Sequence, residues 1–182
     1  AEAFAAEGCQ LVLNARDSGR LDETARELEA QFGVKVTSMA CDVTDTKGVT
    51  QMVSNAWEHH PIDILVNNAG VYKPLPFMEY TAADFRDIFD VNVFAAVHIT
   101  QEMLRKMVPT GRGNVVNIAS TAGKWGSRNQ SAYNMSKHAV VGMTRCVALE
   151  MAPHGIRSNA ICPWIVDTDL ANGFVKGHAD IL

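Results

Sequence analysis

The chain has 182 residues, of which 47% are hydrophobic and 20% are charged, with a net charge of −4 and an isoelectric point of about 5.8. This composition predicts one soluble globular domain over residues 1–182. It argues against nucleic acid or acidic membrane lipid as a partner, because both need a basic face. No apolar run reaches the roughly 18 residues of a membrane helix, and residues 1–4 do not begin a signal peptide. We therefore expect a cytoplasmic protein without a membrane partner.

Strand-like and helix-like segments alternate along the chain. In order, the pattern predicts a helical segment over 1–7, a strand over 11–13, a helix to 32, a strand over 34–39, a helix to 60, a strand over 62–66, a helix over 81–108, a strand over 113–119, a helix over 131–151 and a strand over 156–161. Asp17 or Ser18 can cap the helix that Gly33 ends, and Thr81 with Asp84 predicts a capping box. The alternation predicts an α/β fold: a doubly wound, Rossmann-like parallel sheet that binds ligands beyond the carboxyl ends of its strands.

Neither the cysteines nor the histidines are spaced as metal ligands. The four cysteines are far apart and contain no C-x-x-C pair, and the six histidines contain no H-x-x-x-H pair. We expect reduced thiols and no metal site.

Tyr133 and Lys137 carry the strongest chemical signal. They lie four residues apart in a predicted helix, so their side chains share one face. An ammonium beside a phenol favours the phenolate, so we expect Lys137 to lower the pKa of Tyr133 toward neutrality. Such a tyrosine can exchange a proton with a carbonyl or alcohol oxygen. Ser120, at the end of a predicted buried strand, can reach the same oxygen.

Five ordered motifs together resemble the short-chain dehydrogenase/reductase family. They are Asn67-Asn68-Ala69-Gly70, Asn92 in the long helix, Ser120, Tyr133-x-x-x-Lys137, and Pro163 with Thr168. The resemblance implies that Tyr133 is the general acid/base and that Lys137 lowers its pKa and binds the nicotinamide ribose. It also implies that Ser120 orients the substrate oxygen and that a helix kink at Asn92 holds a water for proton relay. Taken singly, each residue also has an ordinary structural explanation.

The same resemblance implies a nicotinamide cofactor. Asp42 and Val43 correspond to the pair that faces adenine, although Asp42 could instead cap the turn at Thr44. Small residues at Asn68, Ala69 and Gly70 let the ribose approach the backbone. The full set of expected cofactor-binding residues is Arg16, Asp42, Val43, Asn68, Ala69, Gly70, Tyr133, Lys137, Pro163, Val166 and Thr168.

The charge after the second family strand favours NADP(H) over NAD(H). Members that use NAD usually place an acid there to bind the ribose 2′-hydroxyl, whereas this chain has Asn14-Ala15-Arg16. A guanidinium offers planar paired donors to a 2′-phosphate. Asp17 follows, and we expect it to cap the next helix. NAD(H) remains possible.

Two parts of the family pattern are missing. The family opens with a strand and a glycine-rich turn that holds the pyrophosphate, whereas this chain begins inside the following helix. That strand is central in a 3-2-1-4-5-6 sheet, so its absence leaves two strand edges unpaired. The helix and final strand that the family usually adds after Leu182 are missing as well, so we expect a fold that is incomplete at both ends, as in a piece of a longer protein. Trp164 replaces the glycine that usually follows Pro163, and its indole could reshape the pocket.

Two segments look most like those of ketoreductases acting on 3-oxoacyl thioesters or polyketides. They are the loop over residues 120–126 and the stretch of the last predicted helix over residues 136–142. We expect Ser120, Trp125, Asn129, Tyr133 and Trp164, with Phe174, to bind a small-molecule ketone, and residues 167–182 to begin a lid. Loop packing is the alternative for the two tryptophans. Oxidation of a secondary alcohol (a sugar acid, hydroxybutyrate or steroid) and a truncated, non-enzymatic scaffold are the alternative functions. The complete protein is expected to be a homo-oligomer, a dimer or tetramer.

Overall fold

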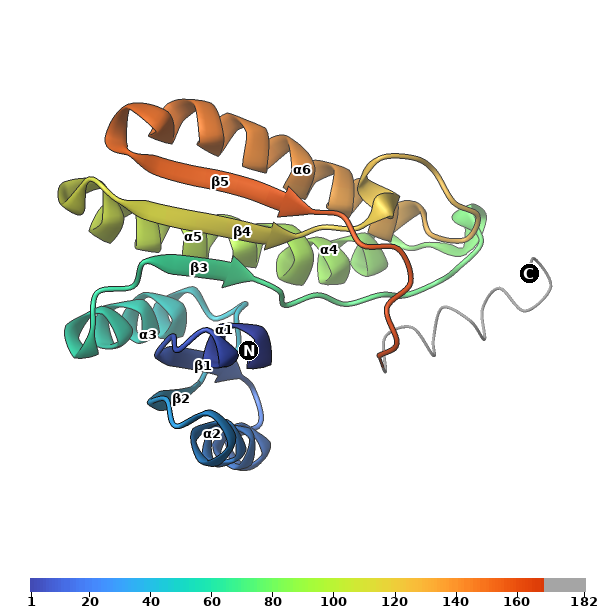
Figure 1. Cartoon of the computed structure of the whole chain (residues 1–182). Coiled ribbons are helices and arrows are strands. Elements are labelled where there is room, and N and C mark those ends of the chain that lie inside the picture. The colour runs from blue at the N-terminus through green and yellow to red at the C-terminus, as the bar shows by residue number, and fades with distance from the viewer. Residues whose placement is uncertain (169–182) are drawn as a thin grey trace. The chain divides into compact units, whose positions relative to one another are not determined.

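Residues 1–168 are described by the computed structural model, and they form two units, Ala1–Pro61 and a second that begins at Ile62. In the first unit, strands β1 (Leu11–Ala15) and β2 (Val36–Ala40) pair in parallel (Figure 1). Helices α1 (Glu2–Ala6), α2 (Ser18–Phe32) and α3 (Thr46–His59) complete this unit. Its core packs α1 and α2 against the strands through Ala5, Ala25, Leu28 and Val36.

The predicted ends of α2 are confirmed. The Asp17 carboxylate accepts a hydrogen bond of 3.1 Å from the Arg20 amide, which satisfies one of the free N–H groups of the first turn. Gly33 follows the last turn with a φ of 67°, a left-handed conformation that glycine adopts without strain. The Asp17 side chain is therefore engaged as the N-cap of α2.

The second unit contains a three-stranded parallel sheet in the order β3 (Ile64–Asn67), β4 (Gly113–Ile118), β5 (Ile156–Ile161). Helices α5 (Ala96–Met107) and α6 (Ser131–Met151) pack against this sheet. Figure 1 shows α6 running alongside β5, with β4 between β5 and β3. Because all pairs are parallel, the carboxyl ends of the three strands lie at one edge of the sheet.

The helix predicted over 81–108 is interrupted by a wide turn. It consists of α4 (Ala82–Phe89), the π-helical segment η2 (Asp90–Ala95) and α5. The predicted capping box at its start is confirmed, and so is the distortion predicted at Asn92. Five of its buried residues stand four positions apart, at Asp84, Ile88, Asn92, Ala96 and Thr100, and Val93 and Ala95 within η2 are buried as well. A helix of 3.6 residues per turn drifts away from such a spacing, and the wider π turn takes up the surplus.

A chain of amides and hydroxyls crosses the interior of the second unit. Asn67 at the end of β3 donates to Thr100 Oγ1 at 2.9 Å and to Asn117 Oδ1 at 2.8 Å, and Asn117 donates to Thr144 Oγ1 at 2.9 Å. Asn117 is fully buried. These bonds tie α5, β3, β4 and α6 together beneath the carboxyl edge of the sheet, and they satisfy polar groups that would otherwise be costly to bury.

The architecture confirms the predicted α/β class with parallel strands. The described residues form two sheets rather than one, and within them no strand pairs with the second edge of β1 or of β3, which agrees with the break expected between these strands. The strands at 34–39 and 62–66 lie slightly later than predicted, at Val36–Ala40 and Ile64–Asn67. Whether residues 1–182 form a single domain stays a prediction. None of the helices within residues 1–168 is both long and apolar enough to cross a membrane.

Candidate active site

Tyr133, Lys137 and Ser120 come together at the carboxyl edge of the three-stranded sheet. Tyr133 and Lys137 lie one turn apart on α6, and the Lys137 ammonium is 5.6 Å from the centroid of the Tyr133 ring. Ser120 follows β4; its Oγ accepts from the Ala122 amide at 3.1 Å, and its interaction with the Tyr133 hydroxyl acts to lower the pKa of that phenol. The predicted convergence of these three side chains is therefore what the structure contains, whereas their catalytic roles stay predictions.

The expected effect of Lys137 on Tyr133 is wrong for this structure. Burial raises the pKa of Tyr133 above 10.0, and the hydrogen bond with Ser120 opposes this rise without reversing it. The Lys137 ammonium donates instead to the carbonyl oxygen of Ile118 at 2.8 Å. Burial also lowers the pKa of Lys137 to about 8, so this ammonium loses its proton at a lower pH than an ordinary lysine. Tyr133 is therefore a phenol rather than a phenolate at neutral pH.

Asn92 connects three segments through its side-chain amide. Its Oδ1 accepts from the Val71 amide at 2.7 Å, and its Nδ2 donates to the Val71 carbonyl and to Ser136 Oγ, both at 3.0 Å. A Cβ atom added at Gly70 would lie 3.4 Å from Asn92 Oδ1 and 3.7 Å from Lys137 Nζ. Asn92 and Lys137 thus converge on the same point of the backbone, at ordinary van der Waals distances from a side chain there.

The segment after Ser120 is wedged between α6 and the end of β5. The short helix η4 (Thr121–Gly123) approaches α6 so closely that a Cβ added at Gly123 would lie 2.7 Å from the Lys137 carbonyl oxygen. The Thr121 amide donates to the Pro163 carbonyl at 2.9 Å. These contacts place Pro163 beside the segment that carries Ser120.

Two of the predicted substrate residues contact each other. The rings of Trp125 and Trp164 have centroids 6.2 Å apart and an interplanar angle of 51°, and both are more than half exposed. The indole at 164 is thus directed toward Trp125. Val166 and Thr168 are exposed, and the Thr168 hydroxyl donates to the Val166 carbonyl at 3.3 Å. Phe174 and most of the predicted lid at 167–182 lie outside the described residues.

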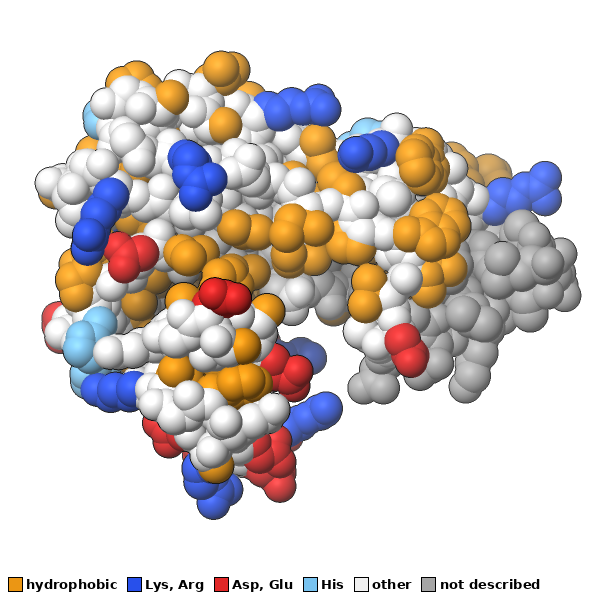
Figure 2. All heavy atoms as spheres, in the orientation of Figure 1, with side chains coloured by type: hydrophobic (Ala, Val, Ile, Leu, Met, Phe, Trp, Pro, Cys, Tyr) orange, Lys and Arg blue, Asp and Glu red, His pale blue; other side chains and the backbone are white. Residues whose placement is uncertain are grey.

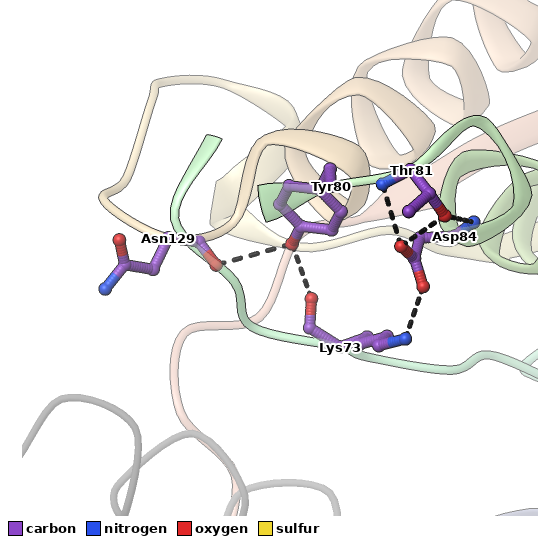
Figure 3. A network of polar contacts seen from close by, with 5 residues as sticks. All are labelled: Lys73, Tyr80, Thr81, Asp84 and Asn129. Atoms are coloured by element: carbon purple, nitrogen blue, oxygen red, sulfur yellow. Dashed lines mark hydrogen bonds and ion pairs between the residues drawn. The ribbon is translucent and has the colours of Figure 1, made fainter. Parts of the chain in front are cut away.

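Asn129 takes part in a polar network through its backbone (Figure 3). Its carbonyl oxygen accepts from the Leu75 amide at 3.0 Å and from the Tyr80 hydroxyl at 3.4 Å. Figure 3 shows its side-chain amide pointing away from Tyr80. The φ of 57° at Asn129 is the only positive value among the described non-glycine residues. Asparagine tolerates this conformation better than most residues.

Sequence reasoning did not predict a role for Tyr72, whose ring packs against the ring of Tyr133. Its ring meets the Tyr133 ring at a centroid distance of 5.2 Å and an interplanar angle of 87°, an edge-to-face contact. Tyr72 follows Gly70 by two residues in a loop without regular periodicity. The only sequence signal was its position directly after the Asn67-Asn68-Ala69-Gly70 motif.

The cofactor residues expected in the first unit lie at the carboxyl ends of its strands. Arg16 follows β1 and is exposed, and Asp42 and Val43 follow β2. Asp42 Oδ1 accepts from the Thr44 amide at 2.9 Å and from the Thr44 hydroxyl at 2.8 Å. These bonds lower the pKa of Asp42, and the Arg16 charge lowers it further. Asp42 thus forms the turn that was its alternative role, and its role toward adenine stays a prediction.

Three further predicted cofactor residues lie directly after β3 and are exposed: Asn68, Ala69 and Gly70. No group of three or more histidine, cysteine or carboxylate side chains within residues 1–168 could hold a metal ion.

Figure 2 shows Lys and Arg side chains scattered among acidic and neutral ones on the described part of the face it draws. This face carries mixed charge rather than a basic field.

In sequence and fold, the chain is similar to known dehydrogenases and reductases. A family model for short chain dehydrogenase matches residues 1–178. A Streptomyces violaceoruber protein named as a ketoacyl reductase of the granaticin polyketide synthase is 37% identical over 184 residues, covering 100% of this chain and 67% of that protein. The solved structure of F189W actinorhodin polyketide ketoreductase with NADPH matches with a TM-score of 0.93 and 34% identity, over 99% of this chain and 70% of that one. NAD⁺-bound xylitol dehydrogenase matches with a TM-score of 0.92 and 32% identity, over 99% and 72%.

Proposed function

Because the chain belongs to the short-chain dehydrogenase family, we propose that it reduces a ketone to a secondary alcohol with NADP(H), using Tyr133 as the acid. The observation that carries this proposal is the convergence of Ser120 and Lys137 on Tyr133, with the Lys137 ammonium 5.6 Å from the centroid of the Tyr133 ring. A phenol whose pKa is raised by burial holds its proton at neutral pH. That state suits a donor of a proton to a ketone oxygen, which is the direction of reduction.

In this mechanism Ser120 and Tyr133 both act on the oxygen of the substrate. The Ser120 hydroxyl orients and polarises the carbonyl, and Tyr133 transfers its proton to the oxygen as negative charge develops there. A bound nicotinamide supplies the hydride that reaches the carbonyl carbon. After each turnover, a proton from solvent would return to Tyr133 through Lys137 and a water held by Asn92, two residues that converge on Gly70.

The residues around Gly70 fit a nicotinamide cofactor. The backbone of Asn68, Ala69 and Gly70 is exposed, and the position of a Cβ at Gly70 would fall between two polar groups able to bind hydroxyls. Lys137 would donate to the nicotinamide ribose, and Pro163, Val166 and Thr168 would line its carboxamide side. Ala69 and Gly70 offer little side-chain bulk against the sugar.

NADP(H) is favoured by the residues of the first unit. Arg16 is exposed at the end of β1, and the neighbouring Asp17 carboxylate is already engaged by the Arg20 amide. A guanidinium offers paired donors to a 2′-phosphate, and the charge of Arg16 also interacts with the Asp42 carboxylate. Asp42 and Val43 would face the adenine. The relatives include one with NADPH and one with NAD⁺, so the choice rests on Arg16.

An apolar or cyclic ketone of the 3-oxoacyl or polyketide kind fits the Trp125–Trp164 pair, and relatives named as ketoreductases support that class. Asn129 would contribute its side-chain amide. Oxidation of a secondary alcohol is the second candidate, because a xylitol dehydrogenase resembles the chain equally in fold. We also propose a homo-oligomer, dimer or tetramer, and a cytoplasmic location.

A cofactor titration followed by a ketone panel tests the proposal. NADPH should quench the tryptophan fluorescence of the wild type and of Tyr133→Phe with the same dissociation constant, while Tyr133→Phe reduces ketones at least about 100-fold more slowly. Full activity in Tyr133→Phe would remove this residue from the mechanism. No quenching at millimolar NADPH would favour the non-enzymatic scaffold.

A further inference from the structure

The backbone from Val71 to Leu75 is held at both ends by hydrogen bonds to other segments, to a side chain at one end and to a backbone carbonyl at the other. At one end, the Asn92 amide bonds both the N–H and the carbonyl of Val71, at 2.7 and 3.0 Å. At the other end, the Leu75 amide donates to the Asn129 carbonyl at 3.0 Å. The Tyr80 hydroxyl donates to the Lys73 carbonyl (Figure 3). The segment is therefore restrained to one path across the site.

The Lys73 side chain adds a second restraint on the same segment. Its ammonium forms an ion pair with Asp84 Oδ1, and Asp84 Oδ2 accepts from the amide and the hydroxyl of Thr81 at 2.8 and 2.7 Å. Figure 3 shows these contacts joining Lys73 to the start of α4. Asp84 is 7% exposed, so one partner of this pair is fixed within the protein. The pair fastens the segment to the capping box of α4.

Tyr72 lies between these two restraints and packs edge to face with Tyr133. The same network reaches the backbone of Tyr133, because Asn92 donates to Ser136 Oγ at 3.0 Å and Ser136 donates to the Tyr133 carbonyl at 2.7 Å. Asn92 and Ser136 are both buried. The side chain of Asn92 therefore links the backbone at Val71, next to Tyr72, to the backbone of Tyr133. It bonds Val71 directly and reaches Tyr133 through Ser136.

We propose that Tyr72 is a positioning residue whose ring fixes the plane of the Tyr133 ring and keeps its hydroxyl on Ser120. This inference rests on the proposed function of Tyr133. A tyrosine ring turns about its χ angles, and its reach toward a substrate oxygen changes with each turn. An edge-to-face neighbour on a restrained backbone limits that rotation, and misplacement of a reacting group by about 1 Å can cost on the order of 100-fold in rate.

The ionisation of the two phenols is consistent with this arrangement. Burial, followed by the neighbouring Tyr80 and Tyr133, raises the pKa of Tyr72 far above that of an ordinary tyrosine. Tyr72 therefore stays neutral while Tyr133 changes its proton, and it adds no charge beside the acid. The groups that face Tyr133 are then Tyr72, Ser120 and Lys137.

Tyr72→Phe and Tyr72→Leu test the proposal, because the first keeps the ring and the second removes it. For reduction of a ketone, Tyr72→Phe should keep kcat within about twofold, and Tyr72→Leu should lower kcat about 10- to 100-fold with the NADPH dissociation constant unchanged. Phe77→Leu is a matched control, since this ring is 66% exposed and its loss should change nothing. Wild-type kcat in Tyr72→Leu would overturn the proposal.

A spectroscopic titration gives a readout that does not need turnover. The chain has three tyrosines, Tyr72, Tyr80 and Tyr133, so a ring-labelled NMR sample gives few signals, and each is assigned by one Tyr→Phe variant. In Tyr72→Leu the pKa of Tyr133 should fall toward 10.0, because burial raises it and water gains access. Tyr72→Phe should keep the wild-type titration. An unchanged pKa of Tyr133 in Tyr72→Leu would contradict the proposed packing.

Tyr80→Phe tests the restraint on residues 71–75 directly. It also provides a second test if Tyr72→Leu does not fold. It keeps a ring but removes the hydroxyl that bonds the Lys73 and Asn129 carbonyls. We expect kcat to fall about 3- to 10-fold with KM for NADPH unchanged. Wild-type kcat in this variant would show that the segment needs no fastening. Activity of Tyr133→Phe separates the hypotheses: if that variant is inactive while Tyr72→Leu is normal, only the positioning role fails.

Discussion

Lys137 donates a hydrogen bond of 2.8 Å from its ammonium to the carbonyl oxygen of Ile118, the last residue of β4. The cation of the site is therefore oriented by a backbone dipole at the carboxyl edge of the sheet. With 5% of the residue exposed, the charged form loses most of its hydration, and its pKa falls to about 8. This lysine can change its charge near physiological pH.

We predict that replacing Lys137 by methionine changes how stability depends on pH. The pKa is about 8 in the folded chain and 10.5 in its usual state, so between these values the unfolded chain binds more protons. The free energy of unfolding of the wild type should therefore rise with pH in this window relative to Lys137→Met, and the difference should be constant below pH 8. Urea denaturation of both proteins across this range measures it. A constant difference throughout would mean that the lysine keeps its ordinary pKa.

Ser120→Ala is expected to lower kcat for ketone reduction about 100-fold, because a donor to the developing oxyanion is lost. The pKa of Tyr133 should rise further, since the hydrogen bond with Ser120 now lowers it. Ser120→Thr keeps a hydroxyl and serves as the control. Steady-state kinetics and tyrosine titration check both effects, and an unchanged pKa in Ser120→Ala would argue against the hydrogen bond.

Arg16→Glu should raise KM for NADPH at least about tenfold and leave KM for NADH unchanged or lower, because a carboxylate repels a 2′-phosphate and accepts from a 2′-hydroxyl. Arg26→Glu makes the same charge change on the exposed face of α2 and should alter neither constant. Comparing the two cofactors in all three proteins is the measurement. A wild-type preference for NADH would refute the role given to Arg16.

Gly123→Ala should destabilise the chain by about 1–3 kcal/mol, because the new Cβ would meet backbone that has no freedom to yield. The Lys137 carbonyl oxygen would lie 2.7 Å away. At Gly126 an added Cβ meets nothing within 4 Å, so Gly126→Ala is the matched control and should stay within about 0.5 kcal/mol. The denaturation midpoints of the two variants, compared with that of the wild type, measure these changes in stability. Equal stability of the two variants would show that η4 can move away from α6.

Local features of the fold could be predicted from the sequence, because they depend on residues close together in the chain. The bounds of α6 and β5, the capping box at Thr81 and the cap at Asp17 follow from periodicity and short spacings. The distortion at Asn92 followed from the family resemblance.

The electrostatics of the site could not be predicted from spacing. Tyr133 and Lys137 share a face as expected, but spacing reports neither the burial that raises the pKa of Tyr133 nor the Ile118 carbonyl that binds Lys137. The contacts of Tyr72, Tyr80 and Asn129 join loops far apart in the chain. No local rule of turn or helix chemistry reaches across such separations.

The wide turn at η2 lets α4 and α5 present their buried side chains on one common face. A π turn holds about one residue more than an α-helical turn, so removing one residue from Asp90–Ala95 while the helix closes to a regular α-helix would leave the later side chains of α5 on nearly the same face. Thr100, Met103 and Met107 would then stay in the interior. The change would fall instead on the turn that carries Asn92, whose amide bonds Val71 and Ser136. A shortened helix would therefore keep its packing and lose the geometry through which it reaches the site.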